Sequence, residues 1–318
     1  MIDILFVHSN ASSKIYQGLA ESHAAIEPPI WAAMLANSAR SQGYEAQILD
    51  AEAERIDYKE TAKRIGDYKA RIICFVVYGQ QPSASSQNMD GACSTASEFK
   101  DLNPESFVVF VGSHVAALPS ETMHSHSFID AVCQNEGVYT LRDLLSVTNL
   151  KDEFILGRVK GLVFRNFQKE VVVNESSLIV PSNMLEYDLP GMAWDLLPSF
   201  SKYRTAGWHS WSNNSEKEPF AALYTSLGCP YRCSFCMINI INRTDQGSNI
   251  SAADSNKFRH WSPEFIIKQF DYFAAHGVKN IKIADELFVL KPRHFMKICE
   301  MIKERGYDFN IWAYSRVD

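Results

Sequence analysis

The sequence predicts an α/β protein with two units: an N-terminal doubly wound parallel sheet followed by a second, shorter unit of alternating strands and helices. Two observations predict this fold. Apolar β-type segments alternate with amphipathic helical segments through about the first 145 residues, and the alternation resumes after residue 216. An irregular, proline-containing stretch separates the two regions. We therefore expect a first domain over residues 1–150, a linker with a short hairpin over 151–215 and a second domain over 216–318.

The elements of the first domain follow from their periodicity. Residues 71–78 are an unbroken β-type run, as expected for a strand buried on both faces of a parallel sheet. Pro28 and Pro29 open a helix, because the first helical turn has no partner for the N–H that proline lacks. The predicted strands are residues 2–7, 45–49, 71–78, 107–111 and 129–133. The predicted helices are residues 28–40, 58–68, 94–102 and 138–145.

The second half of the chain repeats this alternation after the irregular connection. Residues 161–165 and 170–173 predict the hairpin of the linker. Ser262 and Pro263 are typical of an N-cap and a first helical position. The predicted strands are residues 220–225, 280–284 and 309–314, and the predicted helices are residues 263–275 and 292–305.

Composition excludes several classes of protein. The chain has 318 residues, of which 46% are hydrophobic and 21% charged, as in a soluble globular protein. Its net charge of −6 argues against broad nucleic-acid binding. The apolar residues 1–8 lack the basic region and cleavage site of a signal peptide, and no apolar run reaches the ~20 residues of a membrane helix. Seven cysteines, three of them clustered, favour the reducing cytoplasm over a disulfide scaffold.

The clustered cysteines, Cys229, Cys233 and Cys236, follow the strand at residues 220–225. Three thiolates at this spacing can hold three irons of a cubane cluster and leave one iron open for a chelating molecule. A zinc site is the alternative, with His209 or His260 as a further ligand, although tetrahedral zinc usually takes four ligands from paired short spacings.

This C-x3-C-x2-C loop, with Phe235 before its third cysteine, resembles the radical S-adenosylmethionine (SAM) enzymes. The resemblance implies a [4Fe-4S] cluster on the three cysteines, whose open iron binds SAM. It also implies reductive cleavage of SAM to a 5′-deoxyadenosyl radical, and an external electron donor of the flavodoxin or ferredoxin type. In such enzymes the cofactors carry the chemistry, and the protein supplies position and a water-poor cavity.

The strand ends of the first domain resemble the Rossmann-like cobalamin-binding domain of one branch of this family. Ligands of a doubly wound sheet bind beyond the carboxyl ends of its strands. Residues 112–114 are similar to that branch's Gly-Gly-x-His-like turn, and residues 135–137 and the connector 187–198 also match. The resemblance implies cobalamin contacts from the polar and small residues at the strand ends, which are Ser9, Asn10, Ser83, Ser85, Gly112, Ser113, His114, Glu136 and Gly137.

One feature of other cobalamin proteins is absent. The Asp-x-His-x-x-Gly loop that supplies a cobalt-ligating histidine does not follow the first strand, although His8 and His23 lie nearby. We therefore expect a lower cobalt face without a histidine ligand. The alternatives are a cobalamin pocket that has decayed, or a pocket for another small molecule. His114 either lies over the corrin or caps the start of a helix.

The resemblance also implies SAM contacts at the ends of the later strands. Asp285 and Glu286 follow the strand at residues 280–284, where either carboxylate could hold the hydroxyl or amino groups of SAM or cap a helix. Tyr314 and Arg316 occupy positions that lie near a cofactor in the family.

The other four cysteines are expected in the core, because buried free cysteine behaves as a small hydrophobe. They are Cys74, Cys93, Cys133 and Cys299. Their wide spacing is unlike the second cluster of the tRNA methylthiotransferases, which are also radical SAM enzymes.

Taken together, the resemblance implies methyl transfer from methylcobalamin to an unreactive carbon of a small-molecule or natural-product substrate. The alternatives are a radical rearrangement or ring closure without methyl transfer, and a non-catalytic partner that holds a corrin or completes another polypeptide. The family barrel has six strands, and the sequence provides about three of them. We therefore expect a truncated product, a split protein completed by a second chain, or a remnant.

Overall fold

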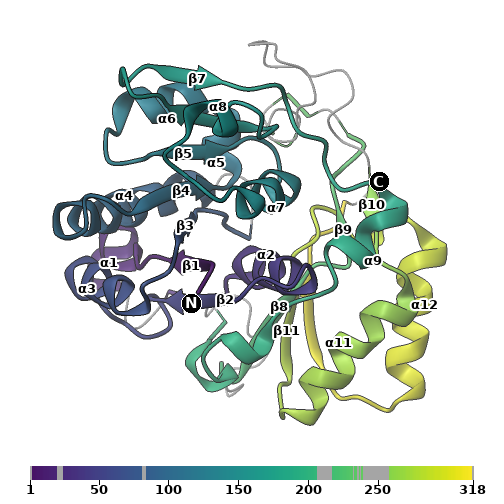
Figure 1. The fold of residues 1–318 in the computed structure, drawn as a ribbon. Helices are drawn as coiled ribbons and strands as arrows, with labels where there is room; N and C mark the ends of the chain where they lie inside the picture. The colour runs from purple at the N-terminus through teal and green to yellow at the C-terminus, as the bar shows by residue number, and fades with distance from the viewer. Residues whose placement is uncertain are drawn as a thin grey trace.

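The computed structural model of the protein describes residues 2–19, 24–80, 84–205, 217–231, 233, 234, 236, 238 and 258–316. Two sheets organise this part of the chain, one of seven strands and one of three (Figure 1). A short two-stranded ribbon joins the second sheet to the loop that holds the clustered cysteines.

The seven-stranded sheet has the order β2-β1-β3-β4-β5-β6-β7. Its first five strands are parallel, as the sequence predicts, and the last two pair antiparallel. The strands are β1 (Ile4–His8), β2 (Ala46–Asp50), β3 (Ile72–Val76), β4 (Phe107–Val111), β5 (Ala131–Cys133), β6 (Leu162–Arg165) and β7 (Val171–Val173).

Helices cover both faces of this sheet, which makes it doubly wound. Ile4 and Phe6 of β1 share a core with α2 (Ile30–Ser41) and α7 (Val138–Ser146). Leu5 and Val7 point to the other face, against α3 (Tyr58–Tyr68) and α4 (Ala84–Leu102). The alternating burial on two faces explains why the strands read as continuous apolar runs. The shorter helices of this half are α1 (Ser12–Tyr16), α5 (Ser113–Ala117), α6 (Pro119–Ser125), α8 (Glu153–Leu156) and α9 (Leu185–Asp188).

Two details differ from the sequence-based prediction. The predicted hairpin forms, but β6 pairs with β5, so it extends the sheet instead of standing in a separate linker. Helix α4 begins ten residues earlier than predicted, at Ala84. The first turns of α4 carry polar side chains, so the sequence shows no helical pattern of apolar residues there. Position 91 inside the helix requires glycine, because a Cβ there would come within 2.9 Å of the Asn10 carbonyl oxygen.

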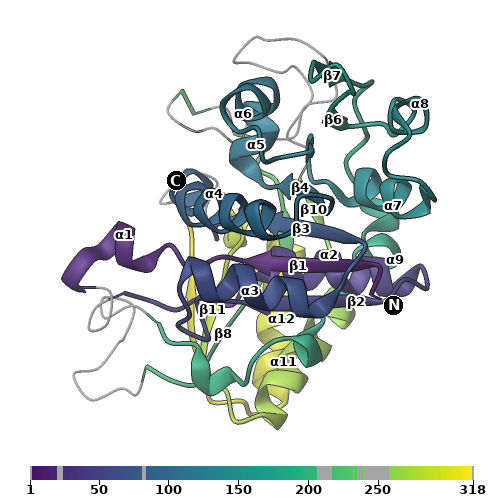
Figure 2. The same ribbon diagram turned by 60° about the vertical axis from the view of Figure 1, so that its left-hand side comes forward.

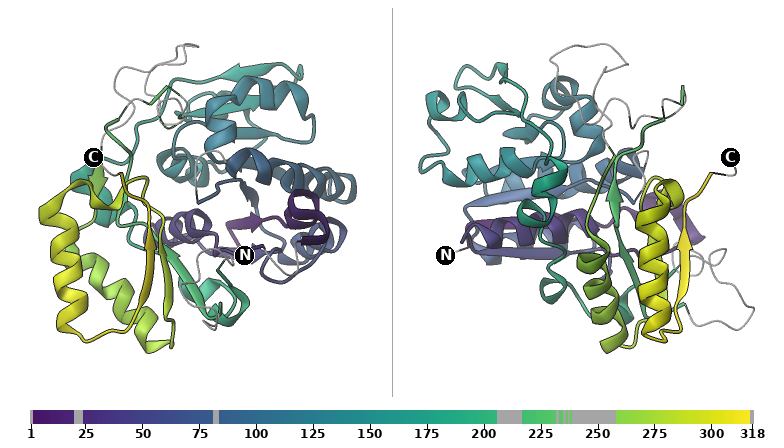
Figure 3. Two further views of the ribbon diagram at one scale, coloured as in Figure 1. Left: turned by 180° about the vertical axis from the view of Figure 1, so that it is seen from behind. Right: turned by 90° about the vertical axis from the view of Figure 1, so that its right-hand side faces the viewer.

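The second sheet contains β8 (Phe220–Leu223), β11 (Asn280–Ile283) and β12 (Asn310–Ala313), which are parallel in the order β12-β11-β8. Helices α11 (Pro263–Ala275) and α12 (Pro292–Glu304) lie side by side on its outer face (Figures 2 and 3). Ser262 caps α11 by accepting a hydrogen bond from the Phe265 N–H, as predicted. The two-stranded ribbon is β9 (Ser226–Leu227) with β10 (Arg259–His260).

The two α/β units share one hydrophobic core. Buried residues of α2 belong to the same cluster as those of β8 and α11. The connector contributes Trp194, whose ring meets Phe273 edge-on at 5.2 Å and whose indole N–H donates to Gln269 Oε1 at 3.2 Å. Because this core is continuous, the second sheet is held at a fixed position beside the first.

Two further sequence-based expectations can be compared with the described residues. Cys74 and Cys133 are buried in strands, but Cys93 is half-buried and Cys299 is exposed. Cys299 follows the buried Ile298 on α12, and the next position of a helix faces away. None of the helices in the described part of the chain has the length and hydropathy needed to cross a bilayer.

Candidate functional site

A cavity of about 360 Å³ lies between the two sheets. One wall comes from the carboxyl ends of β1 and β3 and from the start of α2, and includes His8, Tyr78 and Trp31. The opposite wall comes from the second sheet, with Tyr224, Lys282, Trp312 and Tyr314. The cavity therefore lies where ligands of doubly wound sheets bind, and the second α/β unit closes it.

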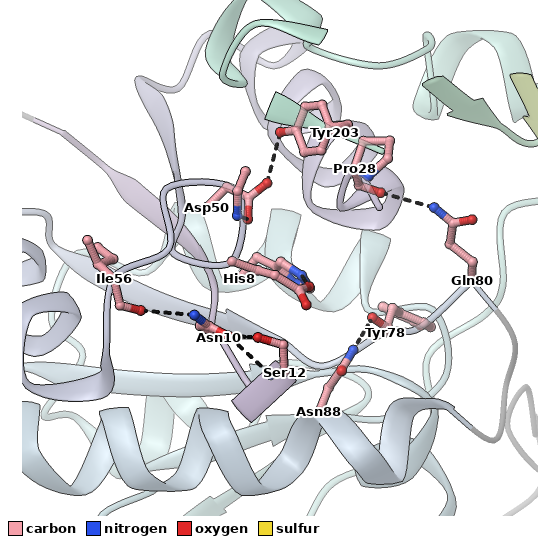
Figure 4. Close-up of polar contacts among 12 residues, drawn as sticks. His8, Asn10, Ser12, Pro28, Asp50, Ile56, Tyr78, Gln80, Asn88 and Tyr203 are labelled. Carbon is pink, nitrogen blue, oxygen red and sulfur yellow. Dashed lines mark hydrogen bonds and ion pairs between the residues drawn. The ribbon is translucent and has the colours of Figure 1, made fainter. Parts of the chain in front are cut away.

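An aromatic pair forms a flat part of the first wall. Trp31 and Tyr78 stack with ring centroids 4.3 Å apart and an interplanar angle of 15°. The Tyr78 hydroxyl donates to the Asn135 carbonyl at 3.2 Å. Figure 4 shows the second contact, in which Asn88 Nδ2 donates to the Tyr78 carbonyl at 2.9 Å. Burial raises the pKa of Tyr78 well above its usual value, so the phenol is neutral.

His8 belongs to a buried polar group at the end of β1. Its Nε2 lies 3.2 Å from Glu52 Oε2. Burial opposes the charge of the imidazole, but the hydrogen bond to Glu52 and the nearby Asp50 outweigh it, so the pKa of His8 is raised. Asp50 accepts a hydrogen bond from the Tyr203 hydroxyl at 2.8 Å, and burial raises the pKa of Asp50 to about 6.

Two buried polar atoms beside this region lack a partner in the described part of the chain: Ser9 Oγ and Gln80 Oε1. Such atoms are rare in folded proteins, because an unsatisfied buried polar group is costly. Asn10, by contrast, donates to the Ile56 carbonyl and accepts from Ser12, and so shapes its own loop (Figure 4). A flat aromatic wall with unsatisfied polar atoms beside it fits cobalamin, whose corrin is flat and edged with amides.

Several residues predicted to contact cobalamin also make hydrogen bonds or close packing contacts inside the protein. The Ser85 hydroxyl donates to the Val77 carbonyl and accepts from the His114 N–H at 2.8 Å. Gly112 has a φ of 153°, and a Cβ there would come within 2.7 Å of Val77. His114 lies in the first turn of α5, with its Nδ1 2.9 Å from Ser86 Oγ.

Residues of the turn after β5 also make contacts inside the protein. Glu136 is buried and forms an ion pair with Arg259 of β10. Gly137 has a φ of 76°, and a Cβ there would come within 2.4 Å of Val111. Ser113 is buried in α5. Ser83 and Phe235 lie outside the described residues.

The cysteine loop begins at Gly228, whose φ is 82°, directly after β9. Cys229, Cys233 and Cys236 are half-buried, and the Cys236 N–H donates to the Cys233 carbonyl at 3.0 Å. Burial raises the pKa of Cys229, and the two other thiols and Glu286 raise it further. By their chemistry, the three thiols are a donor set that fits three irons of a cubane cluster.

The zinc alternative can be compared with the same geometry. Among the described residues, no set of three or more His, Cys, Asp or Glu side chains is arranged to hold a single metal ion. His260 Nε2 lies 2.8 Å from Lys291 Nζ, and its Nδ1 faces the Trp261 carbonyl. His209 lies outside the described residues.

The acidic pair after β11 supports the cysteine loop. Both oxygens of Asp285 are used inside the protein: they accept from the Thr225 N–H, the Thr225 hydroxyl and the Ser226 hydroxyl, each at 2.6 Å. Burial raises the pKa of Asp285 to about 6. Glu286 accepts from the Gly228 N–H at 3.2 Å, and burial raises its pKa to about 7.

The structure separates the other two residues predicted near SAM. Tyr314 lines the cavity. Arg316 lies against the cysteine loop, with its guanidinium 4.0 Å from the centre of the Tyr231 ring and its Nη1 4.0 Å from Cys233 Sγ.

Sequence reasoning missed an ion pair between a buried lysine and a partly exposed glutamate that links the two walls of the cavity. Lys282 Nζ lies 2.7 Å from Glu27 Oε1, and 5.2 Å from the centre of the Trp312 ring. The signal was present: Lys282 lies between Ile281 and Ile283 in β11. Alternation along a strand places the lysine on the face opposite the two isoleucines, away from α11 and α12.

Comparisons with known proteins agree with this geometry. Residues 16–145 match the family model of the B12 binding domain. The chain is 29% identical over 292 residues to an uncharacterized methyltransferase of Pyrococcus horikoshii, covering 92% of this chain and 56% of that protein. It is 27% identical over 208 residues to the cobalamin-dependent radical SAM methyltransferase TokK of Streptomyces tokunonensis, covering 65% of this chain and 27% of that protein. The chain is thus similar to cobalamin-dependent radical SAM enzymes.

Two more relatives extend the comparison to other reactions and to the fold. An anaerobic magnesium-protoporphyrin IX monomethyl ester cyclase of Cereibacter sphaeroides is 22% identical over 313 residues, covering 95% of this chain and 44% of that protein. The solved structure of the cobalamin-dependent SAM radical enzyme OxsB matches with a TM-score of 0.66 at 18% identity, covering 99% of this chain and 39% of that one. The chain thus spans about half or less of the length of these relatives.

Proposed function

We propose that this chain binds a [4Fe-4S] cluster on Cys229, Cys233 and Cys236 and cobalamin in the cavity between the sheets. We further propose that it uses SAM to transfer a methyl group to an unreactive carbon of a small-molecule or natural-product substrate, in the cytoplasm. One observation carries the proposal: the wall of the B12-binding domain and the second sheet, whose strand β8 leads toward the cysteine loop, enclose the same cavity. A reaction that needs both groups requires them at one place.

Different residues have different roles in the proposed reaction. Trp31 and Tyr78 offer a flat face to a corrin, and Gln80 offers a polar atom at its edge. When bound, the cluster supplies the electron that cleaves SAM, and cobalamin supplies the methyl group. Asp285 fixes the strand end from which the cysteine loop starts.

A second reaction class stays open because one relative is named a cyclase. In that case cobalamin would support ring closure or rearrangement without methyl transfer. Analysis of the products separates the two classes, since only methyl transfer consumes a second SAM and releases S-adenosylhomocysteine. We also propose an external electron donor of the flavodoxin or ferredoxin type as a partner.

Cofactor content of cysteine variants tests the binding proposal. After anaerobic reconstitution with iron and sulfide, we expect Cys229→Ser, Cys233→Ser and Cys236→Ser each to lose the cluster absorbance. Cys299→Ser is the matched control, because Cys299 is exposed on α12. Hydroxocobalamin should remain with all four variants through gel filtration. Equal iron content in the loop variants and the control would overturn the cluster assignment.

A further inference from the structure

Gln80 lies directly after β3 in the wall of the cavity. Its side chain is nearly enclosed, with 8% of the residue exposed. The amide Nε2 donates to the Pro28 carbonyl oxygen at 3.4 Å (Figure 4). The amide oxygen, Oε1, has no hydrogen-bond partner among the described residues.

The hydrogen bond to Pro28 fixes which end of the amide faces the protein. A carbonyl oxygen only accepts hydrogen bonds, so the nitrogen of Gln80 must point at it. The unpaired atom is therefore an acceptor. A buried acceptor without a partner carries its full desolvation penalty until a ligand N–H or O–H arrives.

The charged groups of the cavity wall are already paired. Lys282 forms an ion pair with Glu27, and His8 contacts Glu52. A ligand that brings carboxylates to this wall would meet the carboxylates of Glu27 and Glu52 and the unpaired oxygen of Gln80. A ligand that brings neutral N–H donors would satisfy that oxygen without disturbing either pair.

We propose that Gln80 Oε1 accepts a hydrogen bond from a primary carboxamide at the corrin edge, and that it selects amidated corrinoids over their acid precursors. This inference rests on the proposed binding of cobalamin in the cavity. The corrin edge of cobalamin and cobinamide carries carboxamides, whereas that of cobyrinic acid carries carboxylates. A carboxylate has no proton to donate at neutral pH, so it leaves Gln80 Oε1 unpaired.

Equilibrium titration of the full chain with cobinamide and with cobyrinic acid tests the inference, with quenching of tryptophan fluorescence as the readout. We expect the wild type to bind cobinamide at least about tenfold more tightly, which is the effect of one satisfied buried acceptor. Gln80→Met keeps the size of the side chain and removes the acceptor. It should weaken cobinamide binding by about tenfold and change cobyrinic acid binding by less than about twofold.

Gln42→Met is the matched control, because Gln42 is exposed at the far end of α2. It should leave both affinities unchanged. An equal loss of affinity for both corrinoids in Gln80→Met would show a packing role and overturn the inference, as would a wild type that does not discriminate between them. If the wild type binds neither corrinoid, the proposed cobalamin site itself is wrong.

Discussion

Glu136 and Arg259 form a buried ion pair that joins the turn after β5 to the strand beside the cysteine loop. Both residues are only 2% exposed, and Nη1 of Arg259 lies 3.0 Å from Glu136 Oε2. The same Nη1 donates to the Val180 carbonyl at 2.6 Å, and β10 pairs with β9, which leads into the loop. The B12-binding domain and the proposed cluster site are thus connected through one arginine.

Loss of this pair should destabilise the protein without removing a ligand contact. We expect Glu136→Gln to lower the free energy of unfolding by about 3 kcal/mol, because it leaves the Arg259 charge buried and unpaired. Urea denaturation measures the change. The control is Glu105→Gln in the exposed pair with Lys151, which should leave the urea midpoint unchanged. Weaker cobalamin binding at unchanged stability would instead place Glu136 at the cofactor.

Ser85 should also act on stability first. Its hydroxyl connects the Val77 carbonyl with the N–H of His114, across the ends of β3 and β4. Ser85→Ala leaves that buried N–H without an acceptor, which costs about 1–3 kcal/mol. Thermal unfolding of Ser85→Ala and of the exposed neighbour Ser86→Ala compares the two. Equal midpoints would contradict the bracing role.

Asp50 makes a contribution to stability that depends on pH. Burial raises its folded pKa to about 6 from an ordinary value of 3.8. The folded state therefore binds more protons than the unfolded state between about pH 4 and 6, so stability falls as pH rises through this range. The loss amounts to about 3 kcal/mol. Asp50→Asn should flatten the decline in urea unfolding measured from pH 4 to 7, and a decline of equal slope in both proteins would refute this assignment.

Arg316 should tune the proposed cluster. Its guanidinium lies over Tyr231 and near Cys233 Sγ, and N–H donors near cluster sulfur favour the reduced form. Arg316→Gln should therefore make the reconstituted cluster harder to reduce, as followed by potentiometric titration. Arg316→Lys keeps the charge but loses the planar stacking, so the cluster potential of this variant should lie between those of the wild type and Arg316→Gln. Identical potentials in all three proteins would exclude this contact in the loaded state.

Most of the fold could be predicted from the sequence, because local sequence signals and the pattern of apolar residues indicate the same helices and strands. Helix α3 spans the predicted residues 58–68, and Ser262 caps α11 as expected. The start of α4 was missed because only its inward face, with Met89 and Ala92, is apolar. The pairing of β6 with β5 joins segments about 30 residues apart, and no local pattern encodes such a partner.

The site was less predictable than the fold. The spacing of the cysteines points to their chemistry directly. A polar residue at a strand end, however, can face a ligand or support a neighbouring loop, and tertiary contacts decide which. Ser85, Glu136 and Asp285 bond inside the protein, whereas Gln80 and Lys282 line the cavity.

Anaerobic electron paramagnetic resonance of the reconstituted, reduced protein with and without SAM tests the central claim most directly. We expect a cubane signal that depends on Cys229, Cys233 and Cys236 and whose g-values change when SAM is added. A protein that assembles no cluster under these conditions, or that keeps its signal after the three cysteines are replaced by serine, would contradict it.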